Sequence, residues 1–160
     1  MTKELQKALQ TLRDMSPKLN EATDRANELV AAVEAFLNKE CSIGIGARVL
    51  FRETKRQELD PNDDERTQTV EVEEWLVYER IGPGYHIGIA LTELVGGLAE
   101  SYRADIGVLP WSQEDRDTKL ASFAVLPDLL QTIAENVGAV VDKTDGVIDV
   151  VAKLTDALGK

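Results

Sequence analysis

Residues 69–91, TVEVEEWLVYERIGPGYHIGIAL, hold two alternating stretches that are joined by a turn sequence. The first alternates apolar residues with glutamates, and the second resumes the alternation at Tyr85, Ile87, Ile89 and Leu91. Such alternation is typical of β-strands with one buried face. Gly82-Pro83-Gly84 between the two stretches is a strong turn signal. The segment therefore predicts two antiparallel strands that share an apolar, core-facing side.

Further strands are predicted on both sides of this hairpin. Upstream, apolar residues at every second position from Ile43 to Phe51 predict a strand, and a polar run over 58–68 containing DPNDD predicts a solvated loop before the return strand 69–81. Downstream, Tyr102, Ala104, Ile106 and Val108 predict a fourth strand. We expect a three- or four-stranded antiparallel meander, with glutamates of the return strand opposite Arg48 and Arg52 on the outer face.

Heptad patterns of apolar residues lie at both ends of the chain and predict long amphipathic helices. The N-terminal stripe is Leu5, Ala8, Leu12, Met15, Leu19, Ala22, Ala26, Leu29, Val33 and Phe36, and the C-terminal stripe is Leu126, Leu130, Ile133, Val137, Val140, Thr144, Val147, Val151, Leu154 and Leu158. We expect Thr2 to cap the first helix and Ser112 to cap the helix after the sheet. Pro17 and Pro127 predict kinks, and Asp145-Gly146 leaves open a split of the last helix.

The predicted fold class is α+β, in a single domain over residues 1–160. An amphipathic helix over 1–41 precedes an antiparallel sheet over 42–110, and helices with heptad patterning follow over 111–160. The two stripes exceed what a small sheet can cover, so we expect them to pack on each other within one chain, between copies, or both, and we favour a homo-oligomer. The residues predicted to make this packing are Leu12, Leu19, Leu29, Phe36, Leu130, Val137, Val151 and Leu158.

Charge and composition restrict the classes of partner. The net charge is −11, and residues 41–110, with seven basic and thirteen acidic side chains, carry −6 of it. An acidic field disfavours direct binding to nucleic-acid phosphates and favours a protein partner with a basic surface. Cys41 is the only cysteine, which excludes an internal disulfide. With neither a signal-peptide pattern nor a run of about 20 apolar residues, the sequence predicts a cytoplasmic protein without a membrane partner.

Candidate chemistry in the sequence is sparse. Arg48, Arg52, Trp75, His86 and Arg103 fall among the predicted strands, where they could gather to hold an anionic or planar ligand. Gly88 and Ala90, on the same side as His86, leave room for a ligand or for neighbouring backbone. A lone histidine cannot build a His-based metal site, and a Cys41–His86 pair lacks an orienting third group. We predict no catalytic residues, no metal site and no cofactor.

The leading functional hypothesis is therefore a non-enzymatic, acidic interaction module that binds another macromolecule and inhibits or scaffolds it. An accessory protein of a phage or mobile element that occupies a basic surface is a specialised form of this hypothesis. The alternative hypothesis is a small-molecule binding protein that holds an anionic or nucleotide-like ligand in a pocket on the sheet. A third hypothesis, an enzyme that uses Cys41 and His86, is the weakest because the sequence supplies no further catalytic group.

Overall fold

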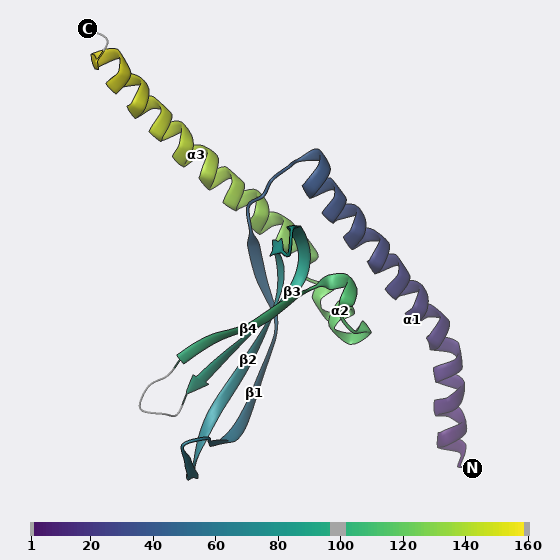
Figure 1. Cartoon of the computed structure of the whole chain (residues 1–160). Coiled ribbons are helices and arrows are strands. Elements are labelled where there is room, and N and C mark those ends of the chain that lie inside the picture. Colours follow the sequence, from purple (N-terminus) through teal and green to yellow (C-terminus); the bar gives the residue numbers. More distant parts are fainter. Residues whose placement is uncertain (1, 97–101, 159–160) are drawn as a thin grey trace.

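The computed structural model describes residues 2–96 and 102–158, and it confirms the α+β class. A long helix, α1 (Lys3–Ala35), ends in a π-helical turn, η1 (Phe36–Glu40). Four strands follow, β1 (Ala47–Asp60), β2 (Asp63–Ile81), β3 (Gly84–Gly96) and β4 (Tyr102–Pro110). A 3-10 turn, η2 (Trp111–Gln113), leads to α2 (Arg116–Phe123) and then to α3 (Leu126–Leu158). The strands form one antiparallel sheet in the order β1-β2-β3-β4 (Figure 1).

The β1–β2 hairpin is longer than the sequence predicted. The loop expected over 58–68 is wrong, because β1 and β2 remain paired up to Asp60 and Asp63, and Asp60 accepts a hydrogen bond from the Asn62 amide at 2.8 Å. This end of the hairpin lies apart from the helices, and most residues on both of its faces are polar (Figure 1). A strand exposed on both sides lacks the apolar alternation by which strands are recognised in a sequence.

The first strand begins later than predicted. β1 starts at Ala47 instead of Ile43, because Ser42 and Gly44 have positive φ angles of 48° and 57° that an extended strand cannot contain. Ile43 still packs against the core from this irregular segment. The predicted turn at Gly82-Pro83-Gly84 is confirmed, and Gly82 adopts a left-handed φ of 64°.

Helix α1 begins at the predicted cap, where the Thr2 hydroxyl accepts a hydrogen bond from the Leu5 amide at 3.3 Å. Pro17 lies inside the helix, which continues through it. The η1 turn attaches the end of α1 to the sheet through Asn38. Its side chain accepts a hydrogen bond from the Tyr78 hydroxyl at 2.7 Å and donates one to the Tyr85 carbonyl at 2.8 Å.

The C-terminal helices differ from the prediction in their caps. Ser112 lies in η2, and the N-cap of α2 is Asp115, whose carboxylate accepts a hydrogen bond from the Thr118 amide at 2.9 Å. A break does separate α2 from α3 near Pro127, which lies in the first turn of α3, where a proline lacks no helical hydrogen bond. The split at Asp145-Gly146 does not occur, since α3 is continuous to Leu158.

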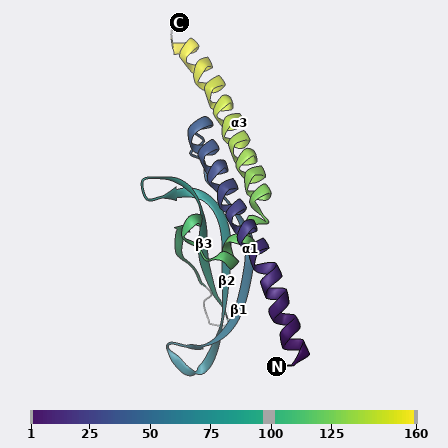
Figure 2. The same ribbon diagram turned by 90° about the vertical axis from the view of Figure 1, so that its right-hand side faces the viewer.

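The core lies between one face of the sheet and the middle of the helical layer. Leu76, Tyr78, Ile87 and Ile89 of the sheet are buried against Val30, Leu129 and Ile133 of α1 and α3, with Trp111 beside them. The helices α1 and α3 run in roughly the same direction and are staggered (Figures 1 and 2). As a result the N-terminal half of α1 extends beyond one end of the layer, and the C-terminal half of α3 extends beyond the other.

Candidate interaction site

The most distinctive surfaces of the protein are two helical arms. We define the α1 arm as residues 3–22 and the α3 arm as residues 138–158; every residue in both arms is exposed. The α1 arm presents large apolar side chains, among them Leu12, which is 65% exposed. The others are Leu5, Leu9, Met15 and Leu19. A helix surrounded by water normally exposes polar side chains, so a continuous apolar stripe of this length indicates an interaction surface.

The stripe of the α1 arm is an extension of the surface that packs in the core. The buried residues of this surface are Thr23, Ala26, Val30 and Leu37. Leu19 and Leu12 lie one and two heptads before Ala26, on the same side of the helix. Next to this row, Leu29 of α1 and Phe36 of η1 lie along the core-covered segment and are nevertheless 37% and 50% exposed. The apolar surface of α1 is therefore wider than the part that its own sheet covers.

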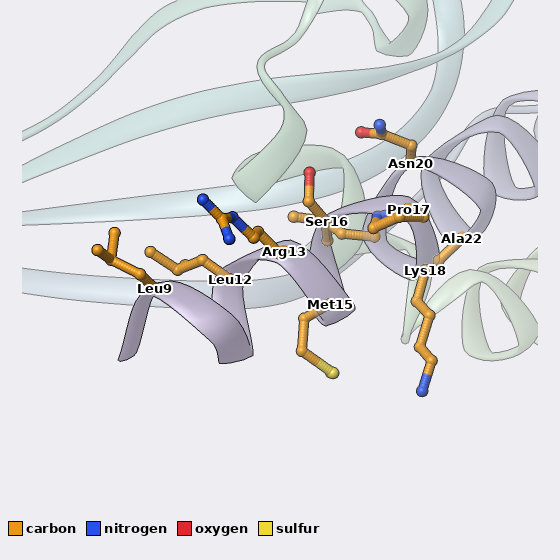
Figure 3. A pocket seen from close by; sticks show the side chains of 10 residues that line it. Leu9, Leu12, Arg13, Met15, Ser16, Pro17, Lys18, Asn20 and Ala22 are labelled. Atoms are coloured by element: carbon orange, nitrogen blue, oxygen red, sulfur yellow. The ribbon is translucent and has the colours of Figure 1, made fainter. Parts of the chain in front are cut away.

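Pro17 shapes the middle of the α1 arm. Its ring nitrogen has no hydrogen to donate within the helix. A hollow surrounds this point, and only α1 residues line it, including Leu9, Leu12, Met15 and Leu19 (Figure 3). A hollow that one helix lines alone is an open surface and not an enclosed pocket. We interpret it as a place where another helix or chain segment could pack.

The α3 arm continues the core-facing row of α3 into solvent. Ile133 is 2% exposed and Val137 is half-buried, whereas Val151 is 52% and Leu158 88% exposed. The exposed apolar side chains of the arm are Val140, Val141, Val147, Ile148, Val150, Val151, Leu154 and Leu158. The change from buried to exposed occurs where α3 leaves the sheet, although the sequence pattern is unchanged there.

The eight residues predicted for helix packing therefore have different surroundings. Leu130 and Val137 pack partly against the core of their own chain. Leu12, Leu19, Leu29, Phe36, Val151 and Leu158 are exposed. Because the arms extend from opposite ends of the helical layer, the two stripes do not meet within one chain (Figures 1 and 2).

Three of the five predicted ligand residues lie on the sheet face opposite the helices. The Arg48 guanidinium pairs with Glu79 at 3.2 Å, as predicted, and the Arg103 guanidinium pairs with Glu73 at 3.1 Å. Arg103 also lies 5.8 Å from the ring centroid of Trp75, whose indole N–H donates to Glu73 at 3.2 Å. Each cationic or aromatic group thus already has a partner within the chain.

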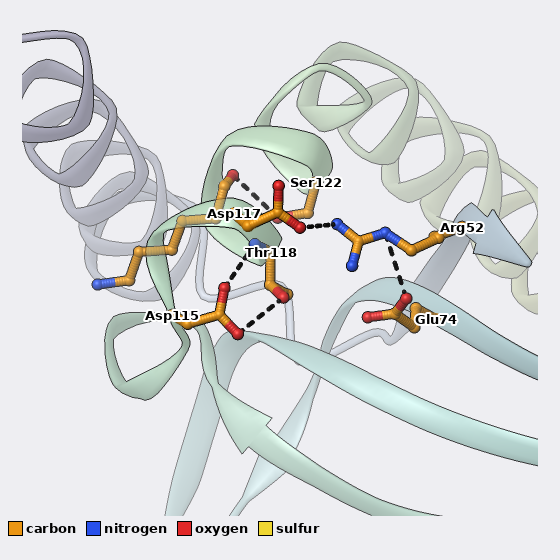
Figure 4. Close-up of polar contacts among 7 residues, drawn as sticks. Arg52, Glu74, Asp115, Asp117, Thr118 and Ser122 are labelled. Carbon is orange, nitrogen blue, oxygen red and sulfur yellow. Dashed lines mark hydrogen bonds and ion pairs between the residues drawn. The ribbon is translucent and has the colours of Figure 1, made fainter. Parts of the chain in front are cut away.

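Arg52 is on the other face, which corrects its predicted position. Phe51 forms a bulge between Leu50 and Arg52, so that Arg52 pairs with Glu74 on the side where the helices pack. Its guanidinium contacts the carboxylates of Glu74 at 3.3 Å and Asp117 of α2 at 2.8 Å (Figure 4). Arg52 therefore connects the sheet to α2 instead of facing a ligand with Arg48.

His86 lies at the edge of the sheet against α1. Its Nδ1 is 3.0 Å from a carboxylate oxygen of Glu34, whose other oxygen accepts a hydrogen bond from the Ile87 amide at 2.8 Å. A hollow of about 300 Å³ is lined here by Glu34, His86, Trp111 and Lys119, among others. Of the five predicted ligand residues, only His86 lines this hollow.

Sequence reasoning missed Glu34, Trp111 and Lys119. Trp111 is 2% exposed, its indole N–H donates to the Ser122 hydroxyl at 2.9 Å, and the Lys119 ammonium lies 5.3 Å from the centroid of its ring. The only signal was that Trp111 directly follows Pro110, where the sheet ends. No local pattern indicates that α1 and α2 meet the end of β3.

Two carboxyl groups directly before α2 have shifted pKa values. Hydrogen bonding from the Thr118 amide lowers the pKa of Asp115. Desolvation, assisted by the charge of Asp115, raises the pKa of Glu114. Burial also raises the pKa of the Tyr78 hydroxyl. These shifts are explained by a helix cap and by core packing, and neither arrangement places a nucleophile beside a base.

Comparisons of the chain with protein-family models, curated proteins and solved structures gave no significant match. Within residues 2–96 and 102–158, no three His, Cys, Asp or Glu side chains gather closely enough to hold a metal ion. None of the described helices has the length and apolar character that crossing a bilayer requires.

Proposed function

We propose that this protein is a non-enzymatic interaction module that binds other protein chains through the apolar stripes of its α1 arm and α3 arm. The observation that carries the proposal is that both stripes continue past the edge of the core with their large side chains exposed. Burying one such leucine- or valine-sized side chain contributes about 1.5–3 kcal/mol. Several along one arm supply enough for specific association even after the entropy cost of binding.

The position of the arms supports a scaffolding role over an inhibitory one. They extend in opposite directions from the helical layer, so the two stripes can be occupied by separate chains or by separate parts of one partner (Figure 1). The acidic sheet, with −6 over residues 41–110, favours a further partner with a basic surface, beside the chains that occupy the arms. Salt is expected to weaken the charge-led part of such a contact and to leave the apolar part in place.

The test is capture of protein partners by tagged full-length chain and by variants with one added charge. Leu12→Glu and Val151→Glu place a carboxylate in the two stripes, and Gln6→Glu and Ala152→Glu add the same charge to the outer sides of the same arms. We expect partners, including copies of the chain itself, to be retained by the outer variants and lost by the stripe variants. Equal capture by all four variants, with helix content unchanged in circular dichroism, would contradict the proposal.

One observation favours a second candidate function, the binding of a small anionic ligand beside His86. Lys119 lies over Trp111 in the hollow at the sheet edge. An ammonium and an aromatic face in one hollow can hold a planar anion. A panel of anionic and nucleotide-like compounds would then raise the melting temperature of the wild type but not of Lys119→Met. Absence of any shift in the wild type excludes this function.

A further inference from the structure

We propose that the chain which covers the arms is a second copy of the same protein. In this dimer the α1 arm of each copy packs antiparallel along the α3 arm of the other, around a two-fold axis perpendicular to the helices. The inference rests on the proposed function, because it names the occupant of the stripes through which that function operates. The length, register, charge and helix propensity of the arms all support it.

The lengths and positions of the arms permit a closed dimer. Residues 3–22 and 138–158 each form a helix about 30 Å long. They extend from opposite ends of two helices that run in roughly the same direction (Figures 1 and 2). Rotating a second copy by a half-turn about an axis through the middle of the layer therefore places an α3 arm beside each α1 arm. Both stripes are covered at once, and the assembly ends at two copies.

The apolar residues of the two arms match in antiparallel register. Spacings of three and four alternate in both stripes, so the six layers stay within one residue of register along both arms. The layers pair Leu5 with Leu158, Ala8 with Leu154, Leu12 with Val151, Met15 with Val147, Leu19 with Thr144, and Ala22 with Val140. Large side chains meet smaller ones in most layers, which lets them interdigitate at normal packing density.

Charge favours the mixed pair over pairs of identical arms. The α1 arm carries four basic and three acidic side chains, hence +1, and the α3 arm carries two basic and four acidic ones, hence −2. Two α3 arms together would sum to −4, whereas an α1 arm with an α3 arm sums to −1. Antiparallel packing also places the positive N-terminal end of α1 beside the negative C-terminal end of α3. Like-charge repulsion therefore selects against the alternative dimer through α3 alone.

The α3 arm also requires a packing partner to be a stable helix. It contains Gly138 and Gly146, and most of its apolar side chains are β-branched, both of which lower intrinsic helix propensity. An isolated helix of this length and composition is unstable in water. A neighbouring helix along the whole stripe supplies the missing stability, and the α1 arm has the required length and surface.

Disulfide trapping tests which arms meet. In a Cys41→Ser background, Met15→Cys and Val147→Cys are prepared with different tags, mixed at equal concentration and oxidised. We expect the mixed disulfide to predominate, because each copy places residue 15 opposite residue 147 of the other. The pair Gln6→Cys and Ala152→Cys on the outer sides is the matched control and is expected to remain reduced. Predominance of disulfides between identical arms would overturn the inference.

Sedimentation analysis of the full-length protein tests whether the dimer exists. We expect a monomer–dimer equilibrium that Leu12→Glu and Val151→Glu each weaken roughly a hundredfold or more, since each buries two carboxylates in the dimer. Gln6→Glu and Ala152→Glu are expected to leave the equilibrium within a few-fold of wild type. A wild-type monomer at all concentrations overturns the inference. If such a monomer still captures a different protein through the stripes, the proposed function stands without it; if it captures none, both fail.

Discussion

Gly88 is placed where two strands approach too closely for any side chain. A Cβ built on Gly88 would lie 2.5 Å from the Leu109 carbonyl oxygen and 2.6 Å from Cδ1 of Ile81. Real Cβ atoms do not tolerate such contacts, and the Leu109 atom belongs to backbone that cannot move without disturbing the β3–β4 pairing. The sequence left open whether a ligand or neighbouring backbone occupies the space beside the small residues at 88 and 90. At Gly88 this space is occupied by backbone.

We therefore predict that Gly88→Ala lowers the free energy of unfolding by about 1–3 kcal/mol, because the methyl group forces β3 and β4 apart. Urea denaturation of purified protein measures this change. Gly107→Ala is the matched control, since a Cβ at Gly107 in the adjacent strand meets nothing within 4 Å. Similar losses from the two substitutions would show that β3 and β4 are not in this close contact.

At the scale of elements, α2 is held by contacts at both of its ends. Asp115 caps the helix and Asp117 pairs with Arg52 of β1 (Figure 4). The Ser122 hydroxyl accepts a hydrogen bond from the Trp111 indole. Ser112 is also followed by acidic residues and resembles a cap in sequence, but Trp111 is buried in the core and holds Ser112 in the preceding 3-10 turn. Ser112 and Asp115 are both acceptable N-cap residues, and the packing of Trp111 determines that Asp115 caps the helix.

The Asp115 cap gives a pH dependence with a definite sign. Its pKa is lowered in the folded protein from the ordinary value of 3.8, so the ionised cap stabilises the fold above that pH, and the stabilisation is lost as pH falls through the lower folded value. We expect Asp115→Asn, which keeps an oxygen acceptor but no charge, to be less stable than wild type at pH 7. The difference is expected to shrink as the pH falls below 3.8 in urea titrations.

Glu114→Gln provides a control of opposite sign. The pKa of Glu114 is raised from 4.5 in the folded state, mainly by desolvation, so its ionised form opposes folding at neutral pH. The glutamine variant is therefore expected to be at least as stable as wild type at pH 7, with the difference disappearing at acidic pH. If both variants changed stability in the same direction, the two carboxyl groups would not have the environments described here.

At the scale of the whole molecule, a central core is continued by two arms that it does not cover. Stability is therefore expected to be uneven, because only the middle of the helical layer is buried against the sheet. Amide hydrogen exchange reports this directly. We expect β2 and β3 to be strongly protected, and the arms to be roughly tenfold or more better protected in the wild type than in Leu12→Glu, in which the dimer is weakened.

The comparison with Gln6→Glu separates assembly from helix damage, since that variant adds the same charge to the same arm without entering the stripe. Its arms are expected to exchange as in the wild type. Identical exchange of the α3 arm in Leu12→Glu and in the wild type would mean that the α1 arm does not protect it. Exchange in the α3 arm is the sharper measurement, because residue 12 is not on that helix.

The sequence by itself determined the α+β class, the order of helices and strands, the turn at Gly82 and the two apolar stripes. Each depends on a periodicity or a turn residue that acts over a few neighbouring positions. Helix propensity was a weaker guide to where the last helix ends. α3 continues through Gly146 because a single glycine costs only about 1 kcal/mol in a long helix.

Only the tertiary structure decided which apolar and polar residues share surroundings. The bulge at Phe51 turns Arg52 to the opposite face from Arg48, and His86 meets Glu34 across 52 positions of the chain. The five predicted ligand residues therefore do not form one pocket. Ala26 and Ile133 are buried, while Leu12 and Val151, which belong to the same patterns, remain exposed. A heptad pattern records that a helix has an apolar face, but coverage of that face depends on how far the sheet extends, and that is a long-range property.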